Sequence, residues 1–284
     1  MRWLVTGAGG MLGQDLVALL ERTGADVTAA ARASLDVTDA TAAERAVEGH
    51  DVVVNCAAWT AVDDAERREP DAFAVNAVGA ANLARGARLA GARIVHVSTD
   101  YVFDGAATAP YAEDAPLAPR SAYGRTKAAG EWAVRAEHDD HLVVRTAWLY
   151  GAGGPCFPKT MARLAADRDS LDVVDDQVGQ PTWTADVADL VLRLVQAEVA
   201  PGTYHATSSG EASWFEFARA VVASVGEPAD KVRPTTSDAF VRPAPRPAFS
   251  VLGHDALRRA GVEPIGPWGE RWEKAAKDVL GTRD

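Results

Sequence analysis

Tyr123 and Lys127 lie four residues apart, near the start of a helix predicted over residues 121–138. This spacing places both side chains on one face of the helix. A phenol has an ordinary pKa of about 10, so tyrosine exchanges protons near neutral pH only where its surroundings favour the phenolate. A lysine ammonium one turn away favours it electrostatically. The pair alone also suits a packed tyrosine beside a lysine that extends to solvent.

Two further segments favour chemistry at this pair. Residues 98–100, Ser-Thr-Asp, end the fourth predicted strand, at the edge where parallel sheets bind ligands. There the hydroxyl of Thr99 can bond both a substrate carbonyl oxygen and the tyrosine. Residues 55–58, Asn-Cys-Ala-Ala, end the third predicted strand and are small enough for a cofactor to lie against the backbone. Thr99, Tyr123 and Lys127 therefore predict a catalytic site for hydride transfer.

Three glycines after the first predicted strand indicate where a cofactor would bind. Gly7, Gly10 and Gly13 recur at a spacing of three as a helix opens. The first permits a tight turn, the second lets a pyrophosphate approach the backbone, and the third lets the helix pack on the sheet. The helix N-terminus then offers N–H groups and partial positive charge to the phosphates. A tight strand-to-helix turn without a ligand is the alternative.

The end of the second predicted strand distinguishes two nicotinamide nucleotides. An acidic residue there would bind the ribose 2′-hydroxyl, whereas an arginine accommodates a 2′-phosphate. The strand over residues 26–31 leads directly into Arg32, with no acid beside it. This favours NADPH, with NADH still possible; a solvated surface arginine is the alternative. Asp36 and Val37 follow closely and can frame the adenine.

The elements that must position these residues alternate in the first half of the chain. Strands that are apolar nearly throughout, each followed by an alanine-rich helix, indicate a parallel sheet covered on both faces. With right-handed crossovers, the predicted fold class is α/β, a doubly wound parallel (Rossmann) sheet. The strands are predicted at 2–6, 26–31, 51–55, 93–98 and 142–147, with helices at about 11–22, 40–48, 70–90 and 121–138.

The pattern loosens after Trp148 and predicts a smaller C-terminal substrate-binding lobe, interleaved with the sheet. We expect residues 1–150 to form the dinucleotide-binding domain, with 183–206 returning to it. Residues 151–182 and 207–284 would form the lobe. Helices are expected near 156–167 and 184–198, and strands at 171–174 and 202–206.

Arg242 and Arg246 lie in a proline-rich segment, residues 240–249, that cannot form an ordinary helix. Few carboxylates are near them in the sequence, and arginine forms charge-assisted hydrogen bonds with phosphates. We therefore expect one of the two, assigned to Arg246, to bind a substrate diphosphate. The acidic doublet Asp63-Asp64 is better explained as a solvated turn or helix cap, and Trp214 as a core residue.

Composition excludes several classes of protein. Of the 284 residues, 48% are hydrophobic and 24% charged, as in globular proteins. A net charge of −11 argues against wrapping nucleic acid or binding an anionic membrane. No apolar run approaches the roughly 18 residues of a membrane span, and no signal-peptide pattern precedes the first strand. Cys56 and Cys156 lack metal-ligand spacing, so we expect a cytoplasmic protein without disulfide or metal.

Longer stretches resemble the extended short-chain dehydrogenase/reductase superfamily and, more narrowly, the dTDP-4-dehydrorhamnose reductase family. The likeness runs from residue 1 to about 280. Residues 98–103, Ser-Thr-Asp-Tyr-Val-Phe, are far more specific than the glycines. The matching stretches are residues 55–63, 98–105, 123–127, 145–150 and 176–182, and the Arg-Pro pair at 246–247.

The resemblance implies NADPH-dependent reduction of the C4 ketone of dTDP-4-dehydro-L-rhamnose to dTDP-L-rhamnose. Tyr123 would give a proton to the C4 oxygen, and Lys127 would lower the pKa of the tyrosine and hold the nicotinamide ribose. Thr99 would tune the tyrosine and, with Asp100, position the sugar, which Trp148 would contact. Motif and resemblance together predict cofactor contacts at Gly7, Gly10, Met11, Leu12, Gly13, Arg32, Asp36, Val37, Ala57, Ala58, Thr60, Tyr123 and Lys127.

Three alternatives stay open. The protein could reduce another dTDP-deoxysugar, or act as a nucleotide-sugar epimerase or dehydratase that recycles a tightly bound NAD. A non-catalytic, NADP-binding regulatory subunit is the third, and the intact Thr/Tyr/Lys set argues against it. Some family members are described as magnesium-bridged dimers, but of those acidic positions only Asp15 has a counterpart, so no metal is expected. Both a monomer and a homodimer remain open.

Overall fold

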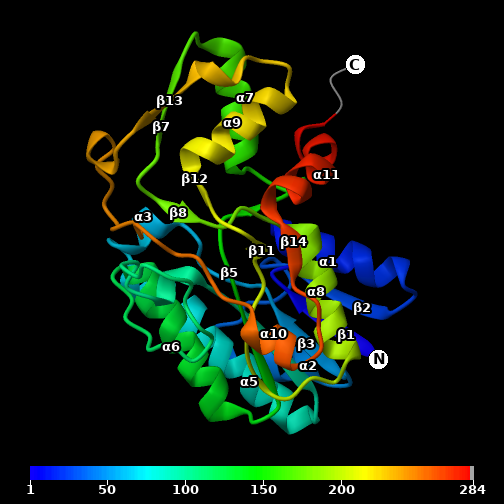
Figure 1. Cartoon of the computed structure of the whole chain (residues 1–284). Helices are drawn as coiled ribbons and strands as arrows, with labels where there is room; N and C mark the ends of the chain where they lie inside the picture. Colours follow the sequence, from blue (N-terminus) through cyan, green and yellow to red (C-terminus); the bar gives the residue numbers. More distant parts are fainter. Residues whose placement is uncertain (282–284) are drawn as a thin grey trace.

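In the computed structural model, which describes residues 1–281, parallel strands form a six-stranded central sheet in the order β10-β5-β4-β3-β1-β2 (Figure 1). Its strands are β1 (Arg2–Thr6), β2 (Asp26–Ala30), β3 (Val52–Asn55), β4 (Arg93–Thr99), β5 (His141–Thr146) and β10 (Gly202–His205). The strand order reverses between β1 and β3, where ligands bind in doubly wound sheets. The predicted α/β fold class is confirmed.

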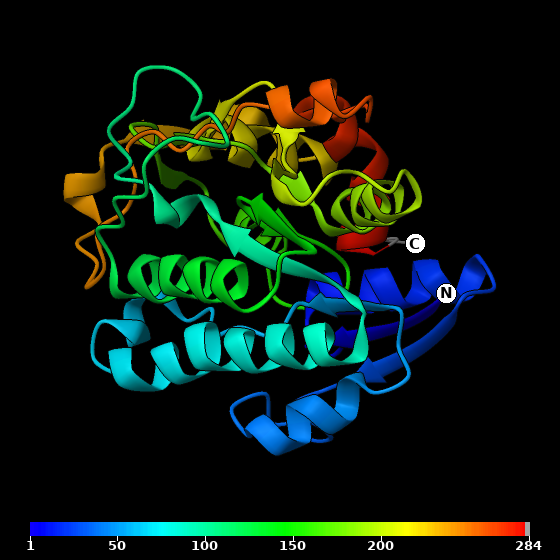
Figure 2. The same ribbon diagram turned by 90° about the horizontal axis from the view of Figure 1, so that it is seen from below.

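Helices cover both faces of this sheet. On one face lie α1 (Met11–Arg22) and α8 (Thr184–Gln196); on the other lie α2 (Ala40–Val47), α5 (Gly79–Ala90) and α6 (Ala122–Glu137). Helices α5 and α6 run side by side (Figure 2). Strand β3 supplies both faces, because Val52 and Val54 join one apolar cluster and Val53 the other.

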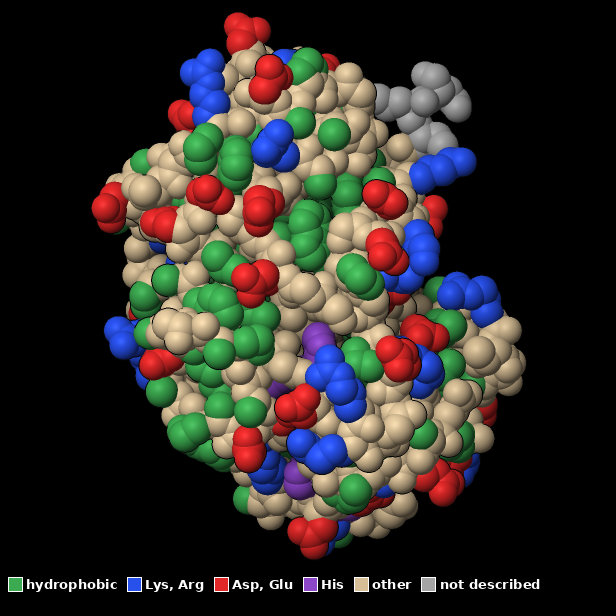
Figure 3. Space-filling model, viewed as in Figure 1, with side chains coloured by type: hydrophobic (Ala, Val, Ile, Leu, Met, Phe, Trp, Pro, Cys, Tyr) green, Lys and Arg blue, Asp and Glu red, His purple; other side chains and the backbone are tan. Residues whose placement is uncertain are grey.

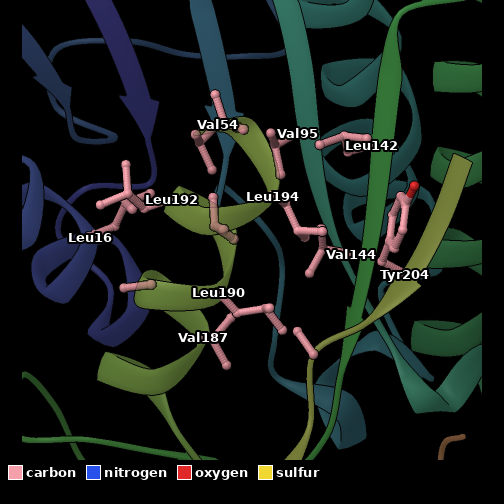
Figure 4. Packing of buried hydrophobic residues seen from close by; sticks show 14 of the residues in the cluster. Leu16, Val54, Val95, Leu142, Val144, Val187, Leu190, Leu192, Leu194 and Tyr204 are labelled. Atoms are coloured by element: carbon pink, nitrogen blue, oxygen red, sulfur yellow. The ribbon is translucent and has the colours of Figure 1, made fainter. Parts of the chain in front are cut away.

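The larger apolar cluster lies between the sheet and the α1/α8 layer. Leu16 of α1 and Leu190 and Leu194 of α8 pack with Val54 and Val144 from the sheet (Figure 4). All five side chains are fully buried. Burying such a side chain stabilises the fold by about 1.5–3 kcal/mol relative to leaving it exposed. This packing holds in place the strands whose carboxyl ends carry the predicted site residues.

The helix predicted over residues 70–90 is interrupted. The chain forms α3 (Val62–Ala65), α4 (Glu69–Phe73) and a π-helical turn, η1 (Ala74–Val78), before α5. Buried Asn76 in this turn accepts a hydrogen bond from the backbone N–H of Trp59 at 2.8 Å and donates to Thr126 Oγ1 at 2.9 Å. The π turn thus ties the loop after β3 to α6, which is typical of π turns near functional sites.

A smaller group of elements stands apart from the sheet, at the top of Figure 1. Helices α7 (Phe157–Asp167), α9 (Trp214–Ser224) and α11 (Trp268–Leu280) pack around Tyr150, Phe217 and Trp272. Beside them β7 (Leu171–Val174) pairs with β13 (Val232–Thr235), while α8 and β10 belong to the main sheet and its covering. The division into two lobes at residue 150 stays a prediction.

Short elements complete the described chain. Strand β6 (Leu149–Tyr150) pairs with β9 (Thr182–Trp183) where the two parts of the molecule meet. The others are β8 (Val178–Gly179), β11 (Ser208–Ser209), β12 (Ala212–Ser213), β14 (Ile265–Pro267), α10 (Asp255–Arg259), η2 (Asp100–Val102), η3 (Ala229–Lys231) and η4 (Ser237–Ala239).

Residues 240–253 run as an extended segment across the loop that follows η2. Phe249 bridges to Ala106 and to Val178. Gly105 has a φ of +74°, and a Cβ there would lie 2.7 Å from the Cα of Pro247. Only glycine therefore permits this close approach. This close approach places Arg242 and Arg246 near Tyr101, just after the end of β4.

The charged side chains do not gather into one patch on the face drawn in Figure 3. Acidic and basic groups are interspersed there, and hydrophobic side chains collect toward the middle. Within residues 1–281, no helix is both long and apolar enough to cross a membrane.

Candidate active site

A cavity of about 540 Å³ opens at the carboxyl ends of β1, β3, β4 and β5. We call it the catalytic cavity. It brings together twelve of the predicted site residues: Gly7, Gly10, Met11, Leu12, Gly13, Ala58, Thr60, Thr99, Asp100, Tyr123, Lys127 and Trp148. Cys56, Val62, Ser98, Tyr101, Thr146, Ala147 and Trp214 also line it.

The glycine turn has the shape of a dinucleotide-binding loop. Gly7 has a φ of +66°, and a Cβ there would lie 2.6 Å from Ala57 N, while a Cβ at Gly13 would collide with the backbone of Gly7. Gly10 precedes α1 in extended backbone and faces solvent. Within the described residues no side chain caps this helix, so its first N–H groups stay available to a phosphate. These residues fit a dinucleotide pyrophosphate.

Arg32, Asp36 and Val37 lie outside the catalytic cavity, beyond the end of β2. Arg32 and Asp36 are exposed, and the Asp36 carboxylate accepts hydrogen bonds from Thr38 N and Oγ1 at 2.9 and 2.7 Å. Those bonds lower the pKa of Asp36. Val37 is buried against Gly79. Ala57 likewise does not line the cavity, and it packs partly buried against the apolar cluster between the sheet and helices α2, α5 and α6.

Thr99 and Tyr123 both line the cavity because the first turn of α6 packs against the end of β4. Thr99 is the last residue of β4, and its hydroxyl donates to Asp100 Oδ1 at 2.8 Å and accepts from Tyr101 N at 3.2 Å. Tyr123 lies in the first turn of α6, which Ser121 caps by accepting from Gly124 N at 3.0 Å. Desolvation raises the pKa of the Tyr123 phenol, and a hydrogen bond with Thr99 partly offsets that rise.

Lys127 lies one turn further along α6 and is buried. Its Nζ donates to the carbonyl oxygen of Val97 at 2.6 Å and lies 3.5 Å from His96 Nε2. Burial lowers the pKa of Lys127 to about 8, against the opposing effects of Glu131 and Cys56. The sequence predicted that Lys127 lowers the pKa of Tyr123. Desolvation, with a contribution from Asp100, gives the phenol a net upward shift that Thr99 only partly offsets, and the lowering by Lys127 stays a prediction.

Asp100 is 2% exposed, and burial raises its pKa to about 6 despite the hydrogen bond that it accepts from Thr99. Its Oδ2 atom and the Oγ1 of Thr146, both buried, have no hydrogen-bond partner among residues 1–281. Both residues line the catalytic cavity. Because both atoms belong to residues that line the cavity, they are available to polar groups of a ligand.

Two stacked tryptophans, Trp148 and Trp214, form part of the wall of the catalytic cavity. Trp148 has a φ of +47°, and its ring lies 3.6 Å from that of Trp214 with 7° between the planes. A Cβ at Gly179 would lie 2.5 Å from the Trp148 ring, so glycine makes room for it. Trp214, predicted to fill the core, packs partly buried against the apolar cluster of α7, α9 and α11 and also lines the cavity from the first turn of α9; its stacking partner is 66 positions away.

A second cavity of about 340 Å³ adjoins the first, sharing Tyr101, Trp148 and Trp214 with it. We call it the arginine cavity, because Arg242 and Arg246 line it. Arg246 is thus not in the catalytic cavity but next to it. The other lining residues are Phe157, Met161, Asp172, Val173, Val174, Gln177, Phe240 and Pro247.

Both arginines already have an acidic partner, contrary to the expectation from nearby sequence. Asp63 Oδ1 lies 2.9 Å from Arg246 Nη2, and Oδ2 lies 3.8 Å from Arg242 Nη1. Asp63 also accepts from the backbone N–H of Ala244 at 3.2 Å. The sequence explained Asp63-Asp64 as a solvated turn or helix cap. In the structure Asp63 also binds residues 242–246 of the proline-rich segment. Its partners lie about 180 positions along the chain, beyond the reach of local patterns.

Asp15 is engaged with another residue. Its carboxylate accepts a hydrogen bond from Thr184 Oγ1. In residues 1–281 no three His, Cys, Asp or Glu side chains gather in a way that could hold a metal ion. The expectation that the protein needs no metal stays a prediction.

A Rossmann sheet, a glycine turn and a Thr/Tyr/Lys set at the end of β4 and the start of α6 define the class of extended short-chain dehydrogenases/reductases. The chain belongs to the dTDP-4-dehydrorhamnose reductase family and is an oxidoreductase. The family model described as the RmlD substrate binding domain matches residues 1–280.

Individual relatives span almost the whole chain. The chain is 52% identical over 274 residues to dTDP-4-dehydrorhamnose reductase of Streptomyces griseus, covering 94% of this chain and 90% of the relative. It is 50% identical over 270 residues to dTDP-4-keto-6-deoxy-D-glucose reductase of Streptomyces niveus, covering 94% and 93%. The solved dTDP-4-dehydrorhamnose reductase of Bacillus anthracis str. Ames, in complex with NADP, superposes with a TM-score of 0.93 at 37% identity, covering 96% and 98%.

Proposed function

We propose that the protein reduces the C4 ketone of dTDP-4-dehydro-L-rhamnose with NADPH, forming dTDP-L-rhamnose. The observation that carries the proposal is one cavity in which Thr99, Tyr123 and Lys127 face the glycine turn, next to a second cavity lined by Arg246. The S. griseus relative is named for this activity, and the B. anthracis relative is solved with NADP.

The dinucleotide would lie across the carboxyl ends of β1, β3 and β4. The uncapped first turn of α1 and the open face of Gly10 suit its pyrophosphate. Arg32, exposed just past β2, suits the 2′-phosphate that distinguishes NADPH from NADH. When bound, NADPH supplies the hydride that goes to C4 of the sugar.

Tyr123 supplies the proton in this proposal. Its raised pKa keeps the phenol protonated at neutral pH, which is the form that a reduction needs at its start. The O–H bond of Tyr123 breaks as the C4 oxygen gains the proton, so the ketone becomes an alcohol and a phenolate is left. The Thr99 hydroxyl then turns from Asp100 Oδ1 to donate to the phenolate, and the Lys127 ammonium stabilises it until it regains a proton.

The two cavities together suit a nucleotide sugar. The stacked pair Trp148 and Trp214 offers a flat apolar wall to the deoxyhexose, and the unpartnered Asp100 Oδ2 offers an acceptor to a sugar hydroxyl. Arg246 lies where the diphosphate would follow. A diphosphate carries more negative charge than the carboxylate of Asp63, so it competes effectively for that guanidinium.

The test is NADPH oxidation by the purified protein with dTDP-4-dehydro-L-rhamnose, with the product identified by nuclear magnetic resonance. We expect NADPH and ketone to be consumed in equal amounts and dTDP-L-rhamnose to form. Absence of turnover with both substrates at millimolar concentration would overturn the proposal.

A second candidate is reduction of another dTDP-4-keto-deoxysugar, which the S. niveus relative favours by its name and its 50% identity. Epimers differ by contacts of a few atoms, so one fold serves both activities. The same assay with dTDP-4-keto-6-deoxy-D-glucose separates them through the ratio of kcat/KM values and the C4 configuration of the product. An epimerase or dehydratase would instead copurify with NAD and consume no NADPH. A cytoplasmic location and a monomeric or homodimeric state stay predictions.

A further inference from the structure

A row of buried polar side chains runs beneath the catalytic cavity, from β1 to α6. Thr6 Oγ1 donates to Asn55 Oδ1 at 2.9 Å, Asn55 Nδ2 lies 3.1 Å from His96 Nδ1, and His96 Nε2 lies 3.5 Å from Lys127 Nζ. None of the four side chains is more than 2% exposed. Lys127 lines the cavity, whereas His96 does not and lies next to Lys127.

The hydrogen bonds assign the proton on His96. The backbone N–H of Ala57 donates to Asn55 Oδ1 at 3.1 Å, and because an N–H only donates, that atom is the amide oxygen. The other amide atom is therefore the NH₂ group, which donates to His96 Nδ1. Burial, together with Lys127 and Arg135, holds the pKa of His96 well below its usual range, so the ring is neutral. Its single ring proton is then on Nε2.

This Nε2–H is directed at a group that also donates. An ammonium has three N–H donors and no acceptor, whereas a neutral amine has a lone pair that accepts. At 3.5 Å, the contact between His96 Nε2 and Lys127 Nζ is long for a hydrogen bond. Lys127 makes its short bond to Val97 O instead, at 2.6 Å. The contact with His96 therefore disfavours the charged form of Lys127.

The other groups that face Lys127 do not cancel this effect. Glu131 on α6 favours the ammonium, but both of its oxygens already accept hydrogen bonds from other side chains. These donors are Ser98, Arg135 and Arg145. Burial raises the pKa of the Cys56 thiol to about 12, so it stays uncharged, and the phenol of Tyr123 keeps its proton.

We propose that His96 is a positioning residue whose Nε2–H disfavours the ammonium form of Lys127 and so lets Lys127 release and regain a proton near neutral pH. The use of this property in catalysis rests on the proposed function. There the N–H bond of Lys127 breaks as the phenolate of Tyr123 regains its O–H bond, and a solvent proton restores the ammonium.

The experiment is a pH titration of Lys127 in the protein labelled with carbon-13 at lysine Cε, which requires neither substrate nor turnover. The chain has five lysines, at positions 127, 159, 231, 274 and 277, so a Lys127→Met sample assigns the resonance. His96→Asn keeps an acceptor for Asn55 and removes the Nε2–H. His96→Gln places an amide oxygen near Nζ. Thr6→Val is the matched control, since it cuts the same row at its far end.

We expect a wild-type midpoint of about 8. In His96→Asn the midpoint rises by about one pH unit, a tenfold change in the ionisation constant, and in His96→Gln it rises at least as far. Thr6→Val leaves it in place. The alkaline limb of kcat/KM moves upward with the midpoint in both His96 variants.

The proposal is overturned if both His96 variants, folded by circular dichroism, titrate at the wild-type midpoint. It is also overturned if Thr6→Val shifts the midpoint as far as they do. A shifted midpoint with an unshifted kinetic limb overturns the catalytic role of the contact. Failure of the proposed function is separate, because it shows as absent turnover by the wild type.

Discussion

The catalytic cavity and the arginine cavity share a wall but differ in how their polar groups are held. In the first, Lys127 and Asp100 are each 2% exposed and have pKa values moved toward neutrality by burial. In the second, Arg246 and Asp63 have side chains 23% and 28% exposed and form an ion pair. One cavity is suited to proton transfer, and the other to exchanging one anionic partner for another.

This difference indicates which mutations should change the rate of the chemical step and which should change substrate binding. A desolvated group that bonds the reacting atoms changes the rate of the chemical step, since it acts on the charge that develops there. A partly exposed arginine bound to a remote diphosphate changes affinity in the ground state and transition state alike. We therefore expect kcat effects from one cavity and KM effects from the other.

The largest effect comes from Thr99→Val. Removing the hydroxyl that bonds Tyr123 and Asp100 should lower kcat by roughly 10²–10³-fold with little change in either KM, because one donor to developing charge is lost. Steady-state kinetics with both substrates varied measures this. Thr60→Val, exposed on the cofactor side of the same cavity, serves as the control and should change kcat by no more than about threefold. Equal effects of the two variants would contradict a specific role of the Thr99 hydroxyl in the chemical step.

Arg246→Ala should have the next largest effect, on KM. A hydrogen bond to a charged group contributes about 1.5–3 kcal/mol, which corresponds to a rise of about 10–100-fold in the KM for the nucleotide sugar. We expect kcat to stay within about threefold of the wild type. Arg242→Ala is the matched control with a smaller rise, since Arg242 is 60% exposed and lies farther from Asp63. An unchanged KM in Arg246→Ala would remove the diphosphate site from this cavity.

The pH profile should report the buried groups of the catalytic cavity. Lys127 loses its proton as the pH rises through about 8, so kcat/KM should fall about tenfold per pH unit above that point. Asp100 gains a proton as the pH falls through about 6, which removes the carboxylate that orients Thr99, so activity should also fall on the acid side. A profile flat from pH 5 to about 10 would contradict both assignments.

The smallest effect is the response to salt. Raising the ionic strength from about 0.05 to about 0.5 M should raise the KM for the nucleotide sugar by about two- to threefold, because the Arg246 pair is partly exposed to screening. The rate of the chemical step should not change, since Lys127 and Asp100 are buried. A salt effect on kcat without one on KM would contradict the assignment of the exposed ion pair to binding and of the buried groups to the chemical step.

The two cavities differ in how much of their structure could be predicted from local sequence. The glycine turn, the residues at the end of β4 and the Tyr123/Lys127 pair were predictable because their partners are close in the sequence or meet at the sheet edge by topology. Every strand of the central sheet was predicted to within a residue at its ends; for β1 and β3 the reason is that buried parallel strands are largely apolar.

The arginine cavity was less predictable, because its contacts join distant parts of the chain. The ion pair of Asp63 with Arg246 and the stack of Trp148 on Trp214 exist only once the fold is formed. The π turn at Asn76 likewise leaves no local mark within an alanine-rich helix. Each of these depends on tertiary contacts that override helix propensity or local charge pattern.

In the proposed function Tyr123 transfers the proton within the catalytic cavity. Single-turnover reduction by Tyr123→Phe, with NADPH and nucleotide sugar both bound, tests it most directly, since phenylalanine keeps the ring that packs edge-on against Tyr101. We predict a rate about 10²–10⁴-fold below the wild type, with the affinity for both ligands unchanged. A Tyr123→Phe variant that reduces the bound ketone at the wild-type rate would contradict the account.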